Sequence, residues 1–388
     1  MPLPEYFEFQ DRTKLIFGPK TIDQAGSEIK NMGGTRVFII TDAVMTKLGL
    51  TERVKKSVES AGVALAGIFD QVPVDSDVEV VQQVYDLAKA AGADIMIALG
   101  GGSCMDTAKG VNILLSEGGS LMDDWQGAYI LERPLKPMLA IPTTAGTGSE
   151  VTFAAVIKDR SHNLKLSFIS PFMAPSAAIL DPDITLSMPK SLTAATGMDA
   201  LSHCVEALHS TTREPISDAL ALHGIRMIAK NLRNAVKDGN DIEARGQMLV
   251  ASTIAGLAFT NALVGIVHGT AHSIGGVAHI PHGVAISIMM PWSMEWNLDF
   301  CTDIYAEVAH AMGVPATGDD RADAIKGIAE IRKLSTEIGV PQTLSAAGAK
   351  EDQLEEIAAA TMGDGSIFTN PRPVEDETEV LALLKQAF

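Results

Sequence analysis

A chain of 388 residues exceeds one ordinary core and suits two domains, each able to bury a large apolar interior. Its formal net charge of −18 argues against a nucleic-acid partner, because phosphate-backbone binding depends on clustered Lys and Arg. Its three cysteines, Cys104, Cys204 and Cys301, form no CxxC pair, which argues against a disulfide framework or a cysteine zinc site and favours a reducing cytoplasm.

Short apolar runs of strand type alternate with helical segments in the first half of the chain. Before them, residues 1–5 lack the basic and apolar segments of a secretory signal, so we expect a cytoplasmic protein. Strands that alternate with helices predict a parallel, doubly wound, Rossmann-like sheet. The predicted strands are 36–40, 63–69, 94–99, 138–141 and 177–180.

Two further alternating runs, 151–157 and 164–168, flank a polar stretch at 158–163. This pattern predicts a β-hairpin inserted into the sheet domain. From about residue 185, where Pro182 and Pro189 interrupt the chain, the pattern changes from short apolar runs to long segments of helical periodicity. We therefore predict an α/β domain at 1–185 and an all-α domain at 186–388. The predicted helices of the second domain are 194–208, 217–236, 242–258 and 321–338.

The uncharged stretch 248–267 has the length of a membrane span. It contains Ser252, Thr253, Thr260 and Asn261 and is rich in Ala and Gly, as a helix buried among other helices would be. We expect a buried helix here and no membrane association.

A glycine-rich turn follows the strand at 94–99. Residues 100–103, Gly-Gly-Gly-Ser, lead directly into a helical stretch that contains Asp106 and Lys109. Glycines allow close approach of the backbone to a ligand, and the free N–H groups of a helix start attract pyrophosphate. Because the pattern is not GxGxxG, it fits either a dinucleotide site or a tight turn that needs glycine.

A second loop rich in hydroxyls and glycines, residues 142–150, follows the strand at 138–141. Thr143, Thr144 and Thr147 could donate hydrogen bonds to phosphate or ribose; the alternative is a polar connection into the hairpin. Ligands of open α/β sheets gather at the carboxyl ends of the strands, so two such loops at adjacent ends support each other.

Asp42 follows the strand at 36–40. A carboxylate there can accept a hydrogen bond from a ribose hydroxyl and repel a 2′-phosphate, which favours NAD over NADP. The alternative is an ordinary helix N-cap.

The second half contains a cluster of histidines with one aspartate. Asp199 and His203 are four residues apart in a helical stretch, so both project from one face. His268 and His272 repeat this spacing, and His282 follows. A single histidine is more often a core residue, but several in an apolar sequence are costly to bury unless they coordinate something. Nitrogen and oxygen ligands without thiolate suit Fe(II), Zn(II), Mn(II) or Co(II) alike.

Taken together, these motifs make the chain closely resemble the iron-dependent (group III) alcohol dehydrogenases, which include lactaldehyde reductase, 1,3-propanediol dehydrogenase and butanol dehydrogenase types. The resemblance runs nearly end to end. Its marks are the glycine turn with Asp106 and Lys109, the segments 142–150 and 194–200, and the histidine region that ends at 281–283. It implies an α/β domain followed by a helical domain, as in dehydroquinate synthase. It also implies hydride transfer between NAD(H) and a primary alcohol or small diol, with self-association as a homodimer or larger oligomer.

The resemblance also assigns roles by position. The implied ligands of the metal, Fe(II) in the family, are Asp199, His203, His268 and His282. His272 is placed beside the substrate as a general base or proton relay, and Asp106 is the second candidate catalytic residue. Phe259 is expected to line the substrate pocket. With Asp42 and Thr147, the candidate cofactor contacts are Gly101, Gly102, Ser103, Thr143, Thr144 and Lys165.

The chain departs from many relatives in three segments. Val74-Asp75-Ser76-Asp77 replaces Pro-Asn-Pro-Thr, so the resemblance does not carry over the usual cofactor contact there. Ala278-His279 replaces a frequent Tyr-Asn, and Leu208-His209 replaces a frequent Tyr-Val. These last changes lie close enough to the predicted metal to alter the choice of substrate.

Three alternatives remain. A lyase of the dehydroquinate synthase type would need several basic residues for a phosphorylated, carboxylated substrate, and residues 197–282 offer few. A zinc glycerol dehydrogenase would use three ligands, whereas four candidates favour the iron-type set. A non-catalytic scaffold with a structural metal would not need two glycine loops.

Overall fold

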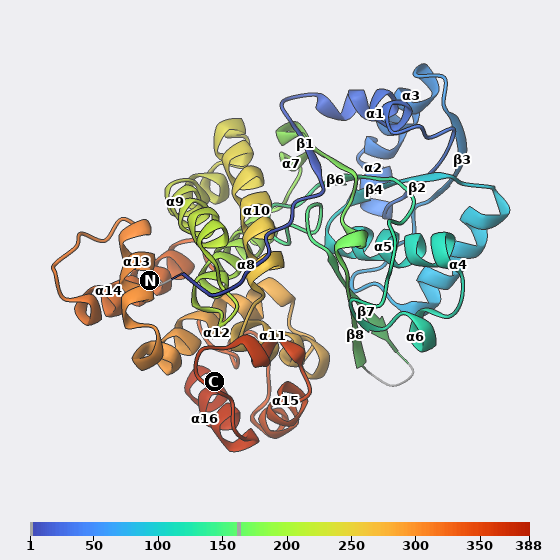
Figure 1. Cartoon of the computed structure of the whole chain (residues 1–388). Helices are drawn as coiled ribbons and strands as arrows, with labels where there is room; N and C mark the ends of the chain where they lie inside the picture. The colour runs from blue at the N-terminus through green and yellow to red at the C-terminus, as the bar shows by residue number, and fades with distance from the viewer. Residues whose placement is uncertain (1–2, 161–163) are drawn as a thin grey trace. The chain divides into compact units, whose positions relative to one another are not determined.

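The computed structural model describes residues 3–160 and 164–388 (Figure 1). The described residues fall into two compact units, Gln10–Ser187 and Met188–Phe388, and residues 3–9 belong to the second. The first unit contains the sheets and the second is helical. The predicted fold class, a parallel α/β unit followed by an all-α unit, is therefore confirmed.

A six-stranded, fully parallel sheet forms the centre of the α/β unit, in the order β1-β9-β6-β4-β2-β3. All five predicted strands are present, and each end lies within one residue of its predicted position. The sixth, β1, was missed because it is a four-residue edge strand with mostly exposed side chains, so no buried apolar run marks it. The strands are β1 Lys14–Phe17, β2 Arg36–Ile40, β3 Ala64–Phe69, β4 Ile95–Gly100, β6 Met138–Pro142 and β9 Ala177–Leu180.

The sheet is covered on both faces, which explains why its inner strands are continuous apolar runs. Every residue of β4 is buried, as expected for a central strand of a parallel sheet. Figure 1 shows the helices α1 Ala25–Asn31 and α3 Leu50–Ser60 on one face of the sheet, and α4 Val78–Ala90 and α5 Gly102–Glu117 on the other. Core side chains beneath the first pair include Ile29, Val54, Ile39, Ile97 and Ile141. The short helices of this unit are α2 Ala43–Lys47, α6 Leu121–Asp124 and α7 Pro182–Thr185.

A second, three-stranded sheet contains the predicted hairpin. β7 Ala154–Asp159 and β8 Leu164–Ile169 pair antiparallel, and β5 Gly127–Ala128 joins β8. The hairpin is confirmed, but β7 begins and ends later than predicted. Lys158 and Asp159, assigned to the turn from their polarity, continue the inward–outward alternation of β7. Residues 161–163 of the predicted turn lie outside the described residues.

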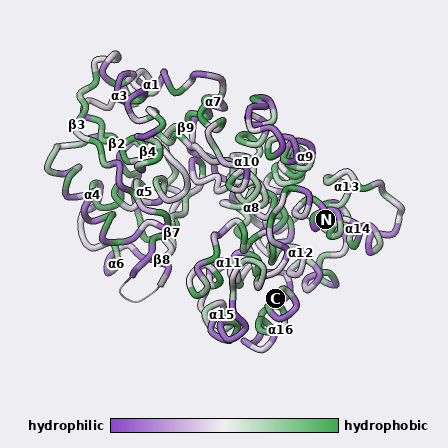
Figure 2. The backbone as a smooth tube through the Cα atoms, turned by 180° about the vertical axis from the view of Figure 1, so that it is seen from behind, coloured by the Kyte–Doolittle hydropathy of each residue, from purple (hydrophilic) through white to green (hydrophobic). Residues whose placement is uncertain are grey.

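The helical unit contains nine α-helices among the described residues. The four predicted helices are confirmed as α8, α9, α10 and α14. Most side chains of α8 and α10 are buried, so these helices lack a clear polar face; Figure 2 shows the hydropathy along them. The helices are α8 Lys190–His209, α9 Pro215–Lys237, α10 Ile242–Ala262, α11 Ile266–Val277, α12 His282–Asn297, α13 Thr302–Ala311, α14 Asp320–Glu337, α15 Leu354–Thr361 and α16 Glu377–Ala387.

The uncharged stretch 248–267 covers most of α10 and the start of α11. Among the described residues, no single helix is long and apolar enough to cross a membrane. The pair Ile242–Ala262 and Ile266–Val277 passes a test of length and composition together, but it is bent by 105° at its break. Met248, Leu249 and Ala255 of α10 are buried inside the helical unit, as expected for a core helix.

Candidate functional site

Three helices of the helical unit bring the predicted metal ligands together. Asp199 and His203 lie one turn apart on α8. His268 lies in the first turn of α11, and His282 is the first residue of α12. The first three are buried, whereas the His282 side chain keeps 32% of its surface exposed.

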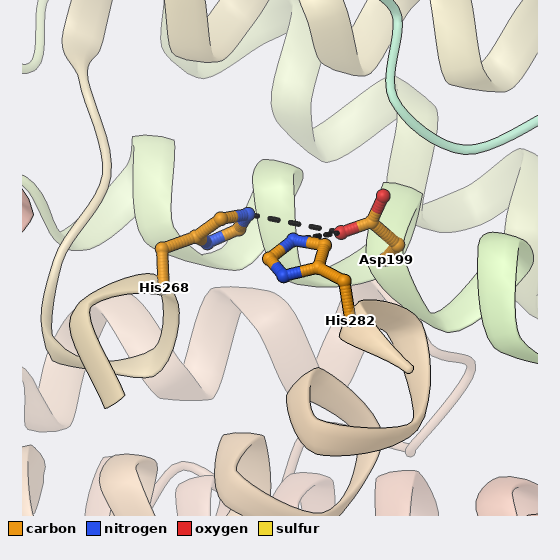
Figure 3. A group of neighbouring side chains, drawn as sticks. All are labelled: Asp199, His268 and His282. Carbon is orange, nitrogen blue, oxygen red and sulfur yellow. Dashed lines mark ion pairs between the residues drawn. The ribbon is translucent and has the colours of Figure 1, made fainter. Parts of the chain in front are cut away.

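Figure 3 shows how the side chains of Asp199, His268 and His282 converge, through one carboxylate oxygen and the imidazole nitrogens. Asp199 Oδ1 lies 3.5 Å from His282 Nε2 and 3.7 Å from His268 Nε2. One potential ligand atom from each of these three residues lies within 4.8 Å of the others. His203 adjoins this group, with its Nε2 3.9 Å from Asp199 Oδ1 and 3.0 Å from His268 Nε2. All four predicted ligands therefore come together. Measured from Asp199 Oδ1, His282 and His268 are nearer than His203, and these two histidines with Asp199 are called the closest group below.

The site contains a buried polar atom that a cation would satisfy. Asp199 Oδ1, the oxygen that faces the three Nε2 atoms, is buried and has no hydrogen-bond partner within the described part of the chain. Leaving such an atom unpaired costs about 1–3 kcal/mol. Two ligands that bind one ion at about 2.1 Å lie about 3–3.5 Å apart. The 3.0 Å and 3.5 Å separations fall in this range, and those of 3.7 Å and 3.9 Å slightly exceed it. This donor set fits a divalent cation.

The electrostatics of the site also favour positive charge. Burial alone would raise the pKa of Asp199, but His203, His268 and His282 hold it well below its ordinary value. Burial lowers the pKa of His203 to about 4, so this imidazole is neutral and has a lone pair to offer. His268 is the exception: despite burial, the charges of Glu206 and Asp199 raise its pKa to about 10. A proton on His268 or a bound cation would satisfy these two carboxylates.

Glu206 is a buried carboxylate beside the predicted ligands that the sequence did not point to. It lies seven residues after Asp199 on the same face of α8, and its Oε2 accepts a hydrogen bond from Nδ1 of His268. Burial opposes its ionisation, but the neighbouring His268 lowers the pKa of Glu206 to about 2. The spacing Asp199, His203, Glu206 on one helical stripe is the signal that could have identified it.

His272 lies beside the closest group rather than in it. Its ring stacks on that of His282, with centroids 5.3 Å apart and an angle of 16° between the planes. Its Nδ1 lies 2.8 Å from Oδ2 of Asp364, a residue between α15 and the last helix. Burial alone would raise the pKa of Asp364, but His272 and Ser366 lower it to about 2. Sequence reasoning also missed Asp364, because 92 residues separate it from His272 and no spacing connects them.

Two further residues noted in the sequence lie near these helices. The Phe259 ring stacks on the His203 ring, with centroids 4.1 Å apart and an angle of 13° between the planes. His279 is exposed and has left-handed backbone with φ of 56°, outside the closest group. Its position in the histidine-rich segment therefore did not indicate a ligand.

In the α/β unit, the two predicted loops leave neighbouring strands at the same edge of the sheet. Gly100 at the end of β4 pairs with Pro142 at the end of β6, and Thr143 N donates to Gly100 O at 3.0 Å. β2 and β4 are adjacent, but the chain continues from β2 to β3, toward one edge of the sheet, and from β4 to β6, toward the other edge. Such a switch point is where open α/β sheets bind ligands.

The glycines of the first loop lie against threonines of the second. A Cβ atom added at Gly101 would lie 3.3 Å from Thr144 Cγ2, and one added at Gly102 would lie 3.0 Å from Thr147 Cγ2. Gly101 is the N-cap of α5, and no side chain caps the helix from that position. The structure therefore places the predicted loop residues side by side at a helix start. Their role in cofactor binding stays a prediction.

Asp42 acts as the N-cap that the alternative interpretation described. Its Oδ1 accepts from Val44 N at 2.8 Å and from Met45 N at 3.0 Å, at the start of α2. Its Oδ2 lies 3.6 Å from Cys104 Sγ, beside the glycine turn. Capping therefore engages Oδ1, and recognition of a ribose by Asp42 stays a prediction.

Ser103 contacts the segment where the chain departs from many relatives. Its Oγ accepts a hydrogen bond from Asp75 N at 3.1 Å. Asp75 has left-handed backbone, with φ of 55°, and Ser76 Oγ lies 2.5 Å from Thr107 Oγ1. The segment Val74-Asp75-Ser76-Asp77 is therefore fixed against the first turns of α5.

Asp106 is bonded through both carboxylate oxygens within the α/β unit. Oδ1 accepts from Ser149 Oγ at 3.1 Å, and Oδ2 accepts from Val156 N at 3.1 Å. Burial raises its pKa, opposed by the charges of Lys109 and Lys165 and by these hydrogen bonds. These contacts connect α5 to the second loop and to β7. The catalytic role of Asp106 stays a prediction.

Lys109 strengthens the same connection from a fully buried position. Its Nζ donates to Ser149 Oγ at 2.9 Å, to Thr152 Oγ1 at 2.9 Å and to Ala154 O at 2.8 Å. Burial lowers the pKa of Lys109 to about 8. Three acceptors around one buried ammonium thus tie α5 to the end of the second loop and to the start of β7.

Comparisons with known proteins agree with both units. Residues 12–182 match the family model "Iron-containing alcohol dehydrogenase", and residues 193–388 match "Fe-containing alcohol dehydrogenase family, C-terminal". The chain is 39% identical to 1,3-propanediol dehydrogenase of Klebsiella pneumoniae, over 96% of both proteins. It is 35% identical to NAD-dependent methanol dehydrogenase of Bacillus methanolicus, over 96% of this chain and 97% of that protein.

A solved structure supports the same relationship. The crystal structure of a 1,3-propanediol oxidoreductase superposes with a TM-score of 0.96 at 38% identity, covering 99% of this chain and 100% of that one. These matches confirm the resemblance inferred from the motifs and favour an alcohol dehydrogenase over the lyase and scaffold alternatives. The chain belongs to the iron-containing alcohol dehydrogenase family.

Proposed function

We propose that this enzyme transfers a hydride between NAD(H) and a primary alcohol or small diol, whose oxidised partner is the aldehyde. The observation that carries the proposal is the convergence of Asp199, His268 and His282 on one point of the helical unit. The names of the two relatives, a 1,3-propanediol dehydrogenase and an NAD-dependent methanol dehydrogenase, support this class of substrate and cofactor.

Asp199, His268 and His282 would hold the metal, with His203 as the fourth ligand. Family membership favours Fe(II), although the nitrogen and oxygen donors also suit Zn(II), Mn(II) or Co(II). Bound there, the divalent ion would supply Lewis acidity toward the oxygen of the alcohol.

The surrounding side chains prepare the site for this chemistry. His203 is neutral at pH 7, because burial lowers its pKa to about 4, and so a proton competes little with the cation for its lone pair. Phe259 stacks on the His203 ring and shields that face from water. Shielding from water strengthens electrostatic interactions at the reacting oxygen.

His272 would move the proton that the alcohol loses. When its Nδ1–H donates to Asp364, its Nε2 is free to accept a proton. The side chain of His272 is 19% exposed, which gives that proton a path to solvent. His272 would therefore act as general base in oxidation and general acid in reduction.

The loops of the α/β unit would hold NAD, which supplies the hydride acceptor. Gly101 and Gly102, which carry no side chain, would let the backbone approach the pyrophosphate at the N-terminus of α5, where free N–H groups attract anions. Thr144 and Thr147 offer hydroxyls beside these glycines. We propose Ser103, Thr143 and Lys165 as further contacts and Asp42 as the ribose acceptor.

A zinc glycerol dehydrogenase is the second candidate. The observation that favours it is that the closest group contains three residues, as in a catalytic zinc site with three protein ligands. The choice of metal and the preferred alcohol separate the two candidates. The expected homodimer or larger oligomer stays a prediction for either.

The test is NADH formation by anaerobically purified protein, with Fe(II) restored, Zn(II) restored or all metal removed. The alcohols are methanol, ethanol, 1-butanol, 1,3-propanediol and glycerol, with 2-propanol as the secondary-alcohol control. We expect NADH from the primary alcohols and the diol only in the Fe(II) sample. Preference for glycerol with Zn(II) would select the second candidate. No NADH from any alcohol, with metal and NAD both bound, would contradict the proposal.

A further inference from the structure

Glu206 is a fully buried carboxylate to which the proposed reaction assigns no role. Its side chain is 0% exposed. It lies on the stripe of α8 that carries Asp199 and His203, at positions i, i+4 and i+7. A buried carboxylate is costly unless it is fully hydrogen-bonded, so its partners indicate its role.

The two oxygens of Glu206 bond different parts of α11. Oε1 accepts from the backbone N–H of Gly265 at 2.8 Å and of His268 at 3.2 Å. Oε2 accepts from Ser202 Oγ at 2.8 Å and from Nδ1 of the His268 ring. Gly265, the N-cap of α11, has no side chain to cap the helix. One carboxylate thus caps α11 and also fixes the ring of the first histidine on it.

The contact with the ring determines which nitrogen of His268 faces Asp199. Nε2 lies 3.7 Å from Asp199 Oδ1, so Nδ1 is the nitrogen on the far side of the ring. A neutral imidazole carries one N–H, and its other nitrogen offers a lone pair. An ionised carboxylate only accepts hydrogen bonds, so Glu206 keeps the hydrogen on Nδ1 and leaves Nε2 free as a ligand.

We propose that Glu206 is a positioning residue of the metal centre, which fixes the ring orientation and tautomer of His268 through the start of α11. The inference rests on the proposed function, because it assumes that a cation binds at Asp199, His268 and His282. The hydrogen bonds of this one side chain would position both the start of α11 and His268, the ligand that α11 carries.

The substitution Glu206→Gln separates these two tasks with little change in volume. An amide has one accepting oxygen and one donating NH₂ group. If the oxygen faces the two backbone N–H groups, the NH₂ group meets Nδ1 of His268 and drives the ring hydrogen to Nε2, where it blocks a cation. If the oxygen faces the ring, both backbone N–H groups lose their acceptor. Either arrangement weakens the site.

The test measures Zn(II) affinity of the metal-stripped protein by competition with a chelator, independently of turnover. We expect Glu206→Gln to bind Zn(II) about tenfold to a hundredfold more weakly, as for other residues that support metal ligands. Glu206→Asp keeps a carboxylate, which only accepts hydrogen bonds, so its Zn(II) affinity should lie between those of Glu206→Gln and the wild type. Ser202→Ala removes the neutral donor to the same oxygen and should stay within about threefold of the wild type.

A second readout reports the tautomer directly. With ¹⁵N-labelled histidine and saturating Zn(II), the wild-type ring of His268 should show Nδ1–H and a metal-bound Nε2. We expect Glu206→Gln to lose this pattern and Glu206→Asp to retain it; assignment comes from signals missing in His268→Gln.

The outcomes separate the two hypotheses. Wild-type Zn(II) affinity and an unchanged His268 pattern in Glu206→Gln would overturn the role of Glu206 and leave the metal site intact. Equal loss of affinity in Glu206→Gln and Ser202→Ala would also overturn it, because general packing would then be responsible. A wild-type protein that binds no Zn(II) at Asp199, His268 and His282 would instead refute the metal site on which the inference depends.

Discussion

The two units would hold their ligands by different means. In the α/β unit, the candidate site consists of backbone groups, hydroxyls and glycines where β4 and β6 end. In the helical unit, it consists of specific side-chain atoms from α8, α11 and α12, supported by buried carboxylates. The first depends on space and free N–H groups, the second on charge and lone pairs. Substitutions in one unit should therefore leave the ligand of the other bound.

The largest effect is expected from Asp199→Asn. The amide keeps the size of the side chain but removes the one negative charge in the closest group. Bound metal should be lost and turnover should fall by about a thousandfold, since a metal supplies several kcal/mol and each 1.4 kcal/mol is tenfold. Metal analysis and steady-state kinetics measure both. NADH affinity is the internal control and should not change; full metal content with normal turnover would rule out Asp199 as a ligand.

His272→Ala should slow turnover by about a hundredfold, the usual scale for loss of a general acid–base group. Bound metal should remain, because His272 lies outside the closest group. His282, which stacks on His272, provides the comparison: His282→Ala should lose the metal as well. Metal loss in His272→Ala equal to that in His282→Ala would show that His272 is a ligand.

Gly102→Val tests the candidate cofactor site of the α/β unit. The added Cβ would lie 3.0 Å from Thr147 Cγ2, so the valine side chain would press the second loop away from the start of α5. NADH should bind about tenfold more weakly or worse, because close approach to the phosphates is lost, while metal content stays normal. NADH fluorescence titration measures the affinity. Gly276→Ala in α11, where nothing lies within 4 Å of the added atom, is the matched control. Unchanged NADH affinity in Gly102→Val would place the cofactor elsewhere.

The smallest effect concerns the pH dependence of stability. In the folded protein the pKa of Asp364 is about 2, below its ordinary 3.8, because His272 and Ser366 outweigh the effect of burial. A lowered carboxyl pKa stabilises the folded state above about pH 4, and this contribution is lost as the pH falls toward 2. The variant Asp364→Asn lacks this stabilising contribution at every pH. At pH 7 its Tm should be about 2–4 °C below the wild type.

The gap in Tm should narrow between about pH 4 and pH 2. Thermal unfolding followed by circular dichroism across this range measures it. Asp86→Asn, at an exposed carboxylate on α4 of the other unit, serves to separate a local effect from general acid sensitivity. A gap in Tm for Asp364→Asn that stays constant with pH would contradict the assigned pKa.

The sequence predicted features that a local pattern encodes. Continuous apolar runs marked the four inner strands, whose two faces are covered, and the apolar edge strand β3, whereas the mostly exposed edge strand β1 carries no buried run. The four-residue spacing of Asp199 and His203 marked one face of a helix. That pattern did not separate His268 from His272, because ligation depends on where α11 packs against α8; the resemblance made that distinction.

Contacts distant in sequence required the structure. Asp364 bonds His272 across 92 residues, and the carboxylate of Glu206 bonds the start of α11 across 59 residues. Asp42 shows the converse, because its N-cap role could be predicted locally whereas any role in ribose binding depends on a ligand. Local rules thus predicted the elements and many site residues, but not the buried carboxylates that support the histidines.

The most direct test of the two-site account is anomalous diffraction at the iron edge, from crystals grown anaerobically with Fe(II) and NADH. The account predicts one iron peak per chain within about 2.3 Å of the Asp199 carboxylate, His268 Nε2 and His282 Nε2. It also predicts NADH density at Gly101 and Gly102, and the distance from the peak to His203 Nε2 shows whether the ion has a fourth protein ligand. An iron peak elsewhere, or none at these residues in crystals that contain one iron per chain, would contradict it.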